Sequence, residues 1–539
     1  MATESLIEVL LHHWPAVLGV ALVAYLLKNK FNRGLNKYPG PLLASFTDWW
    51  RFWIVLRRRP EVHHIRLHEE LGHVVRLGPN ALSFSDPKAL KTIYGLNKGF
   101  VKSEFYPVQQ SVAGGHRLPS LFSTTSEAFH AQLRRSVNSA FSMSTLIQYE
   151  PFVDSTTELF LNQTDKLYAE KGEGCNFSRW LQFYAFDVIG EMTYSKRHGF
   201  LEDNKDVDGI IDYIAGLFDY VAPIGQIPIL DLFLLKNPIY LMLSKYGLID
   251  ATMPVARFAR DRMAERYPKM QDKNKSSVLP STEPIKPMAQ PDLLSKFVQS
   301  KTDRPEFMTD SLVMTMAVSM AFAGSETTAI SLSSVFYYLL KNERCMQRLY
   351  EELDGRAREG FFKDSKHGLV TWSESQDLPY LDACIKEAFR LHPAPGLPME
   401  RVVPPQGAEI AGHFIKGGTI VGCSAWVLHR NKDIFGEDVD VYRPERWLID
   451  ESKDRGEEEK RIKEMTGTML QFGMGARTCI GKNISLLEIY KLVPTVLRRF
   501  EVRLQDPTKD WTVHNAWFVR QLNFNTTFHR RELVQPTSA

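Results

Sequence analysis

The sequence predicts a mostly helical protein that is held in a membrane by one N-terminal helix. Residues 9–27 contain no Asp, Glu, Lys or Arg, which is the pattern of a membrane-spanning helix. Residues 310–341 form a long helical pattern in which Glu326 is the only charged residue between the two ends. A further helical pattern begins at Lys482, directly after a glycine-rich loop. Strands are expected only in short segments, such as a hairpin over 410–421 with its turn at Gly417-Gly418.

The composition is that of an ordinary globular protein, because the net charge of the 539-residue chain is only +3 and 44% of its residues are hydrophobic. This balance excludes a disordered chain and a nucleic-acid-binding protein. The length allows several domains or one large enzyme. The five cysteines are widely scattered, and an odd number without close pairs argues against a disulfide framework or a zinc site and indicates a reducing compartment.

The N-terminal apolar stretch is long enough to cross a bilayer. As a helix, residues 9–27 would span roughly 30 Å, about the thickness of the hydrocarbon core. Basic residues follow it and mark the cytosolic side, so residues 1–8 are expected in the lumen. The alternative is a cleaved signal peptide, but no basic segment precedes the apolar run. Residues 28–41 then read as a basic linker with a Pro-rich hinge, and 42–539 as one cytosolic domain.

The loop over residues 472–481, Phe-Gly-Met-Gly-Ala-Arg-Thr-Cys-Ile-Gly, holds the most informative cysteine. Its three glycines indicate a tight turn. Cys479 stands just before the helix that begins at Lys482, where the helix dipole and free amide donors lower the pKa of a thiol. Arg477 can pair with a carboxylate of a bound group. Such a thiolate suits the axial ligand of a haem iron, and the alternative is a buried structural cysteine in a glycine-rich turn.

The middle of the 310–341 helix reads Ala-Gly-Ser-Glu-Thr-Thr over residues 323–328. A second membrane span is a poor alternative, because Glu326 at mid-bilayer would cost about 2.5–3.5 kcal/mol. In a protein core, alanine and glycine leave room for a flat cofactor and a diatomic ligand, and Glu326 and Thr327 place an acid and a hydroxyl beside that room. A threonine hydroxyl that takes over a backbone acceptor also distorts such a helix locally.

Two further pairs of residues share a helix face. His130 and Arg134 are four residues apart, and Glu387 and Arg390 are three apart. Each pair has a simpler alternative. The first can belong to a solvated basic helix, and the second can be an exposed ion pair worth under about 1 kcal/mol.

Three longer stretches can be explained by composition alone. The apolar segment 215–249 is core helix by default. Residues 271–290 are polar and rich in proline and serine, as in a surface linker. The charged run 451–464 reads as a solvated face or an insertion.

Taken in order, these motifs resemble those of the cytochrome P450 family, and the resemblance covers most of the chain after residue 40. The pattern Phe-x-x-Gly-x-Arg-x-Cys-x-Gly is similar to the haem-ligand loop, and 323–328 is similar to the oxygen-activation motif. Glu387 and Arg390, followed by Tyr-Arg-Pro-Glu-Arg-Trp over 442–447, resemble the segments that form a buried charge triad. Ser485 departs from the pattern, since alanine is more frequent there. Within that family, the sequence resembles the fungal microsomal members, such as the pisatin demethylase-like enzymes of secondary metabolism.

The resemblance implies a mainly α fold with a small β portion and one catalytic domain around haem b. Cys479 is implied as the ligand of the haem iron, and Glu326 and Thr327 as the catalytic acid and hydroxyl. The remaining implied roles are haem contacts for His130, Arg134, Arg401, Phe472 and Arg477, a structural triad of Glu387, Arg390 and Arg446, and substrate contacts for Phe322, Ala323, Leu397 and Phe518.

The implied activity is that of a monooxygenase, which inserts one oxygen atom from O2 into an apolar small molecule held under 215–249. Electrons would come from NADPH through a separate NADPH-cytochrome P450 reductase, with cytochrome b5 as a second donor, at the endoplasmic reticulum membrane. Two alternatives stay open. One is a haem-thiolate isomerase or dehydratase without external electrons, against which the intact Glu326-Thr327 pair argues. The other is a non-enzymatic haem-binding membrane protein.

Overall fold

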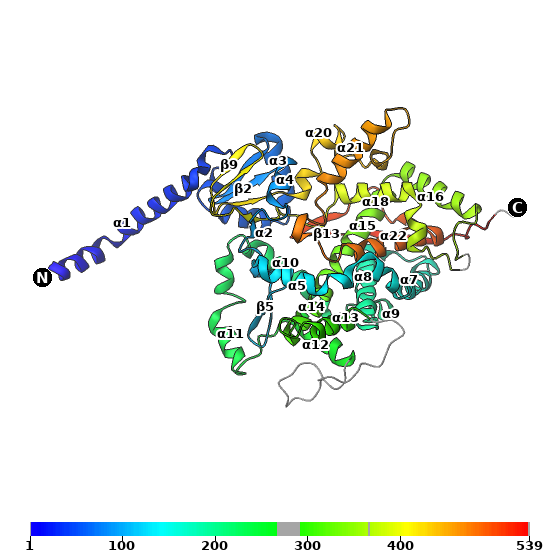
Figure 1. The fold of residues 1–539 in the computed structure, drawn as a ribbon, viewed down its shortest axis with the longest axis horizontal. Coiled ribbons are helices and arrows are strands. Elements are labelled where there is room, and N and C mark those ends of the chain that lie inside the picture. The colour runs from blue at the N-terminus through cyan, green and yellow to red at the C-terminus, as the bar shows by residue number, and fades with distance from the viewer. Residues whose placement is uncertain (1, 267–291, 365–366, 537–539) are drawn as a thin grey trace.

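The computed structural model describes residues 2–266, 292–364 and 367–536, without the side chains of residues 2–12 and 266. Helices form most of this part of the chain, and short strands form small sheets (Figure 1), so the predicted mainly α fold with a small β portion is confirmed.

The helices are α1 (Ala2–Lys30), α2 (Trp49–Leu56), α3 (Pro60–Leu71), α4 (Lys88–Ile93), α5 (Glu127–Val137), α6 (Met143–Leu146), α7 (Glu150–Thr164), α8 (Phe177–Tyr194), α9 (Phe200–Asp203), α10 (Ile210–Ile224), α11 (Pro238–Lys245), α12 (Pro254–Arg266), α13 (Leu293–Asp303), α14 (Asp310–Ala323), α15 (Glu326–Leu340), α16 (Glu343–Arg358), α17 (Trp372–Gln376), α18 (Pro379–Leu391), α19 (Ala425–Leu428), α20 (Lys432–Phe435), α21 (Arg455–Thr468) and α22 (Lys482–Arg499). The strands are β1 (Val74–Gly78), β2 (Ala81–Phe84), β3 (Val101–Lys102), β4 (Ser111–Ala113), β5 (His116–Leu118), β6 (Cys175–Asn176), β7 (Arg401–Val402), β8 (Ala408–Ile410), β9 (His413–Ile415), β10 (Ile420–Gly422), β11 (Phe500–Leu504), β12 (Thr512–Ala516), β13 (Phe518–Leu522) and β14 (Asn525–Arg530).

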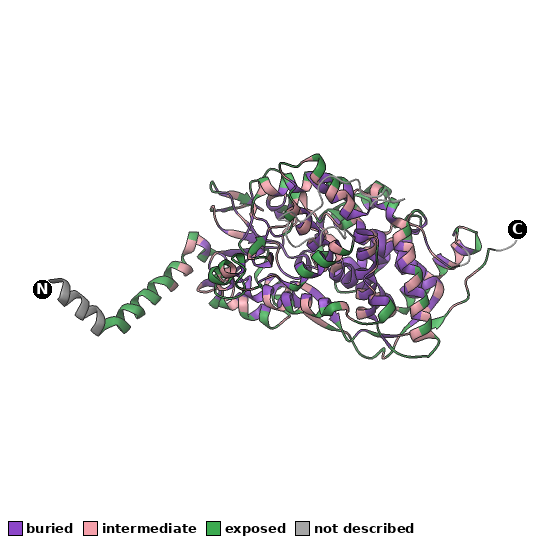
Figure 2. Cartoon of the chain, turned by 90° about the horizontal axis from the view of Figure 1, so that it is seen from below, coloured by how far each residue is buried: buried purple, intermediate pink, exposed green. Residues whose placement is uncertain are grey.

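Helix α15 lies at the centre of the helical core. It packs against α8, α18 and α22, and most of its residues are buried. Buried residues are concentrated in the interior of the helical part of the molecule (Figure 2). Its apolar residues occur on every face, which is typical of a helix surrounded by protein. Thr328 Oγ1 donates to Ser485 Oγ of α22 over 3.2 Å, so the serine at the position where alanine is frequent is used to join the two helices.

The helix expected over 310–341 is divided into α14 and α15 at Gly324 and Ser325. The Thr327 hydroxyl donates to the Ala323 carbonyl over 2.8 Å, as the sequence predicts for a distorted helix. Gly324 was expected to leave room for a ligand, but it does not. A Cβ there would lie 2.6 Å from Ile189 Cγ1, so the glycine allows α8 to approach closely.

The largest sheet has five strands in the order β1-β2-β10-β7-β3, with β10 parallel to β2 and the other neighbours antiparallel. The hairpin expected around Gly417-Gly418 has its turn at the wrong position. Strands β8 and β9 form the hairpin, with its turn at Ala411 and Gly412, whose φ angles are 47° and 79°. Gly417 and Gly418 instead lead into β10. A Cβ at Gly417 would lie 2.3 Å from the Pro405 carbonyl oxygen, so this close approach of the two segments requires glycine.

Helix α1 projects away from the rest of the molecule (Figure 1). Its described apolar side chains are exposed, up to 71% for Val20. Within the described part of the chain, no helix combines the length and the apolar character needed to cross a bilayer. The span predicted over 9–27 therefore stays a prediction. Residue 1 and the side chains of the rest of the predicted luminal segment 1–8 lie outside what the structure describes, as do the side chains of residues 9–12 and the linker predicted over 271–290.

The structure brings the three residues of the expected charge triad together in the core. Glu387 accepts from Arg390 over 2.8 and 2.9 Å and from Arg446 over 3.2 Å, and each of the three is at most 2% exposed. Trp447 Nε1 also donates to Glu387, over 2.9 Å, and Asp438 pairs with Arg446 at 2.9 Å. The triad thereby fixes α18 to the segment that precedes the Cys479 loop.

Replacing Arg390 with leucine should lower the free energy of unfolding by about 3–5 kcal/mol, because Glu387 would be left as a buried charge with fewer partners. Urea titration of the purified protein measures this loss. The matched control is Arg66→Leu, which breaks the exposed pair with Glu70 and should leave stability nearly unchanged. Equal losses in the two variants would contradict the buried role.

Candidate active site

The Cys479 loop is held in shape by its own backbone. The Cys479 N–H donates to the Phe472 carbonyl over 2.8 Å, and the Thr478 N–H donates to the Gly475 carbonyl over 3.1 Å. Gly475 has a φ of 68°, and a Cβ there would lie 1.9 Å from the Tyr94 carbonyl oxygen, so no other residue fits. The loop ends where α22 begins at Lys482, as the sequence predicts.

The Cys479 side chain faces a space inside the protein. It is accessible to solvent, yet it lies so deep that burial is the largest influence on its pKa. Burial raises the pKa of the thiol, while the N–H groups of Gly481 and Lys482 and the charge of Arg134 lower it. The expected lowered pKa is therefore wrong for the thiol alone, because desolvation outweighs the helix terminus. A bound metal cation would reverse this balance and favour the thiolate.

Positive side chains from four parts of the chain converge beside this loop. Arg134 of α5 donates to the Thr478 carbonyl over 2.6 Å, one residue before Cys479. Arg477 is ion-paired with Glu127 at 2.6 Å and donates to the Leu121 carbonyl over 3.2 Å. The sequence therefore places Arg134 and Arg477 correctly at one site, although it gave no role to Glu127.

Lys102 and Arg401 complete this cluster from the edge of the five-stranded sheet. They are paired directly opposite each other on β3 and β7, and each is at most 6% exposed. The Lys102 ammonium lies 4.1 Å from the centre of the Tyr106 ring, and Arg401 donates to the Tyr106 hydroxyl over 3.3 Å. Burial, followed by the charges of Arg401 and Arg477, holds the pKa of Lys102 well below its usual range. Like charges directly opposite each other destabilise a sheet unless an anion offsets them.

His130 lies in the same cluster as a neutral ring. It is 3% exposed, and its pKa falls to about 3 through burial and then through the charges of Arg477, Arg134, Lys102 and Arg401. In the described part of the chain, Glu127 is the only carboxylate that forms an ion pair with these four cations. The excess of buried positive charge fits a ligand with two carboxylates, and the adjacent sulfur fits its metal. Haem b has both.

Glu326 is a buried acid next to the helix break. It is 2% exposed, and neither of its carboxyl oxygens has a hydrogen-bond partner in the part of the protein that the structure describes. Burial raises its pKa to about 7, Arg520 at 3.5 Å from Oε1 lowers it, and Asp219 raises it. Thr327 follows it, with its hydroxyl on the Ala323 carbonyl. Ala323 is exposed although Ala321 and Ser325 are buried, so the break opens onto an internal space.

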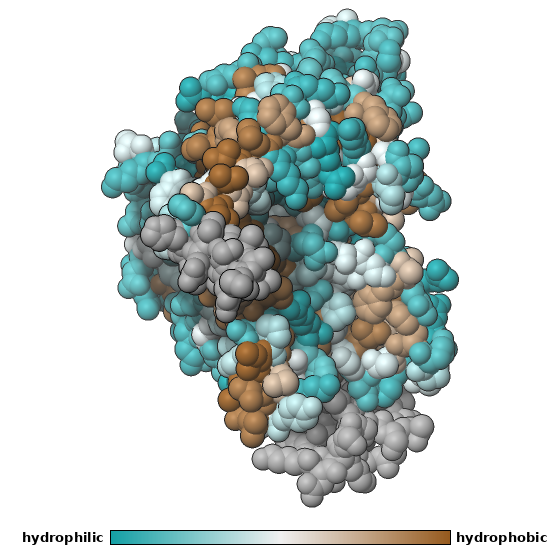
Figure 3. Space-filling model, turned by 90° about the vertical axis from the view of Figure 1, so that its left-hand side faces the viewer, coloured by the Kyte–Doolittle hydropathy of each residue, from teal (hydrophilic) through white to brown (hydrophobic). Residues whose placement is uncertain are grey.

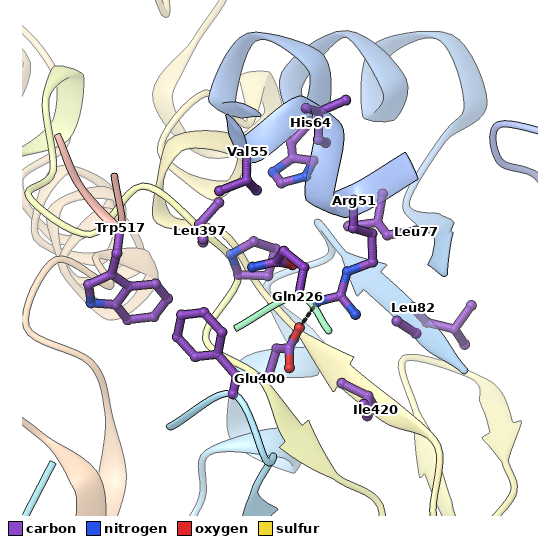
Figure 4. Close-up of a pocket in the computed structure, with 15 residues that line it drawn as sticks. Arg51, Val55, His64, Leu77, Leu82, Gln226, Leu397, Glu400, Ile420 and Trp517 are labelled. Atoms are coloured by element: carbon purple, nitrogen blue, oxygen red, sulfur yellow. Dashed lines mark hydrogen bonds and ion pairs between the residues drawn. The ribbon is translucent and has the colours of Figure 1, made fainter. Parts of the chain in front are cut away.

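The predicted substrate contacts fall into two places. Phe322 and Phe518 both pack against Phe218 of α10, with ring centres 4.9 Å apart in each case. Leu397 lies elsewhere, in a small pocket that Trp517 also lines and in which Arg51 and Glu400 form an ion pair (Figure 4). Phe472 packs edge-on against Phe389 of α18, with ring centres 5.7 Å apart.

Sequence reasoning missed Lys102 and Glu127. Lys102 stands in a two-residue strand and Glu127 at the start of a helix, so neither belongs to a recognisable pattern. Phe218 lies in the apolar stretch assigned to the channel roof, but spacing alone does not distinguish it from its apolar neighbours.

The thiol, the excess of buried cations and the buried acid at a helix break together define a haem-thiolate protein. The family model described as Cytochrome P450 matches residues 43–526, and the chain belongs to that family. It is 41% identical over 502 residues to the cytochrome P450 monooxygenase cicH of Emericella nidulans, covering 93% of this chain and 95% of that protein. It is 41% identical over 468 residues to a cytochrome P450 monooxygenase of Aspergillus terreus, covering 87% and 90%. It is 36% identical over 499 residues to the cytochrome P450 monooxygenase asR2 of Sarocladium schorii, covering 92% and 93%. The chain is thus a monooxygenase, an oxidoreductase that uses haem b and takes electrons from a redox partner.

Replacing Lys102 with methionine should weaken haem binding about tenfold, because one charge-assisted contact to a haem carboxylate is lost. The haem-free protein should become no less stable, since the repulsion between Lys102 and Arg401 disappears. Haem titration and unfolding of the haem-free protein measure the two effects. Lys98→Met, at an exposed position four residues earlier, should change neither. Unchanged haem affinity in Lys102→Met would remove this residue from the site.

Proposed function

We propose that the protein inserts one atom of O2 into an apolar small molecule, by hydroxylation, epoxidation or oxidative demethylation, in fungal secondary-metabolite biosynthesis. The observation that carries this proposal is the helix break, where the buried acid Glu326 is followed by the hydroxyl of Thr327. The named relatives are fungal monooxygenases, which supports the setting.

The residues divide the chemistry between them. Cys479 would hold the iron, and Arg134, Arg401, Arg477 and Lys102 would hold the haem carboxylates. When bound, haem supplies O2 binding and activation, so that one oxygen atom enters the substrate and the other leaves as water with two protons and two electrons.

The protein's own part in the reaction is proton delivery. Glu326, with a pKa of about 7, both holds and releases a proton near neutral pH, as a general acid requires. The Thr327 hydroxyl donates to the Ala323 carbonyl, which leaves its lone pairs free to accept a hydrogen bond from a water molecule on the proton path.

The substrate class is inferred from three aromatic side chains that pack together. Phe218, Phe322 and Phe518 present aromatic carbon and no hydrogen-bonding group, which favours an apolar small molecule. Phe218 of α10 lies in the stretch 215–249, under which the family resemblance implies that the substrate is held.

Electrons would come from NADPH-cytochrome P450 reductase, with cytochrome b5 as a second donor. The sequence has no Gly-x-Gly-x-x-Gly after a strand that would indicate a dinucleotide site of its own.

We further propose that the protein is a single-pass protein of the endoplasmic reticulum membrane with a cytosolic catalytic domain. Apolar side chains are exposed on α1, near α2 and around α11, and Figure 3 shows such side chains on the face from which α1 projects. Examples are Leu42 at 66%, Trp49 at 55%, Phe233 at 71% and Ile239 at 66%. Large exposed apolar areas of this kind mark membrane contacts.

The topology can be tested with glycosylation. Asn162, Asn176 and Asn525 head acceptor motifs that should stay unmodified in cells, because a cytosolic domain never meets the luminal enzyme. An Asn-x-Thr acceptor appended to the N-terminus should be modified and should shift the electrophoretic mobility until a glycosidase removes the glycan. Modification of the native acceptors, or none at the appended one, would contradict the orientation.

The activity test measures oxygenated product with and without NADPH and the reductase. Product should appear only when both are present, and Cys479→Ala should lose both product and the absorption band of the reduced CO complex, because the thiolate is gone. Turnover without reductant would favour the isomerase or dehydratase alternative. Haem binding without turnover of any apolar substrate would favour the non-enzymatic one.

A further inference from the structure

Arg520 of β13 stands between two carboxylates that belong to different helices. Its Nε lies 3.5 Å from Glu326 Oε1, and its Nη2 donates to Asp219 Oδ1 of α10 over 3.3 Å. The Nε has no hydrogen-bond partner among the described residues, so the contact with Glu326 is the weaker one. A single guanidinium thus divides its charge between Glu326 and Asp219 of helix α10.

The pKa values of the two carboxylates are shifted in opposite directions. Burial works against ionisation of Asp219, but the hydrogen bond from His514 at 2.7 Å and the charges of Arg58 and Arg520 outweigh it, so its pKa is lowered. Burial dominates at Glu326 and raises its pKa to about 7. Environments that push the pKa values of two acids apart in this way separate a permanently charged carboxylate from an acid that takes up and releases protons.

Other charged groups nearby are occupied elsewhere. A cleft of about 410 Å³ reaches Glu326 and Arg520, and Arg179 and Asp212 also line it. Arg179 is paired with Asp212 at 3.0 Å and with Asp206 at 3.3 Å. His514 and Arg58 contact Asp219 rather than Glu326. The charges that act on Glu326 are therefore those of Arg520 and Asp219.

Two of the three elements that carry a charge of this link, α10 and β13, also carry an aromatic ring of the predicted substrate site. Phe218 and Asp219 are neighbours on α10, Phe518 and Arg520 are two residues apart on β13, and Phe322 and Glu326 flank the helix break. A shift of the rings therefore moves the charges with them.

We propose that Arg520 is a positioning residue that acts through Glu326, and that Asp219 draws its charge away from Glu326 to a degree set by the position of α10. A shift of α10 then changes how strongly Arg520 favours the ionised form of Glu326. This deepens the proposed function, since it assigns the control of the same proton path.

The test follows the protonation of Glu326 in the resting protein by infrared difference spectroscopy over a pH titration, with Glu326→Gln identifying its carboxyl band. Arg520→Gln should raise the midpoint by about one pH unit, because a cation that favours the carboxylate is lost. Asp219→Asn should lower it, because a repelling charge disappears and Arg520 turns to Glu326. Arg520→Lys should stay closer to the wild type than Arg520→Gln, and Arg179→Gln, in the same cleft, should leave the midpoint unchanged.

A double-mutant cycle tests whether Asp219 acts through Arg520. In the Arg520→Gln background, Asp219→Asn should shift the midpoint much less than it does alone. Equal shifts in both backgrounds, shifts of the two single variants in the same direction, or no shift in either would overturn the proposal. The titration needs no oxygenated product, so its failure is distinct from a failure of the proposed monooxygenase activity.

Discussion

The concentration of positive charge around the Cys479 loop is the constraint on which the rest of the structure depends. Arg134, Arg477, Arg401 and Lys102 come from a helix, a loop and two strands that are far apart in sequence. Among the described residues, the one carboxylate ion-paired with any of them is Glu127, which pairs with Arg477. Burying so many like charges is costly unless an anion is bound among them. The fold is therefore built around a ligand that carries both negative charge and a metal, and the thiol is placed beside it.

The central helices reconcile a dry core with a polar reaction. Helix α15 is buried on almost every side, yet it begins at a break where the Thr327 hydroxyl donates to a backbone carbonyl. The acid at this break has no hydrogen-bond partner among the residues that the structure describes. The triad around Glu387 shows the opposite solution, since every charge there is matched by donors. Fully paired charges hold the fold together, and unpaired ones are kept where protons must move.

The sequence predicts those parts of the site that depend on short-range patterns. The loop at 472–481, the helix start at Lys482 and the hydroxyl at Thr327 each follow from neighbouring residues and appear where expected. The predicted lowering of the Cys479 pKa and the predicted hairpin turn at Gly417-Gly418 were wrong, because burial and strand pairing depend on distant parts of the chain. Lys102 and Arg520 could not be found for the same reason. Lys102 lies opposite Arg401, about 300 residues away in the sequence, and Arg520 lies beside Glu326, about 200 residues away. No local pattern encodes such a pairing.

The two-residue strand β3 has a consequence for the life of the protein in the cell. It is the last strand of its sheet, and its pairing with β7 sets Lys102 against Arg401. A newly synthesised chain that has not yet received its prosthetic group must tolerate this repulsion at an edge with few hydrogen bonds, so that edge opens first and becomes accessible to proteases. The abundance of the enzyme should therefore track the cellular supply of iron porphyrin, through turnover of the chains that remain empty.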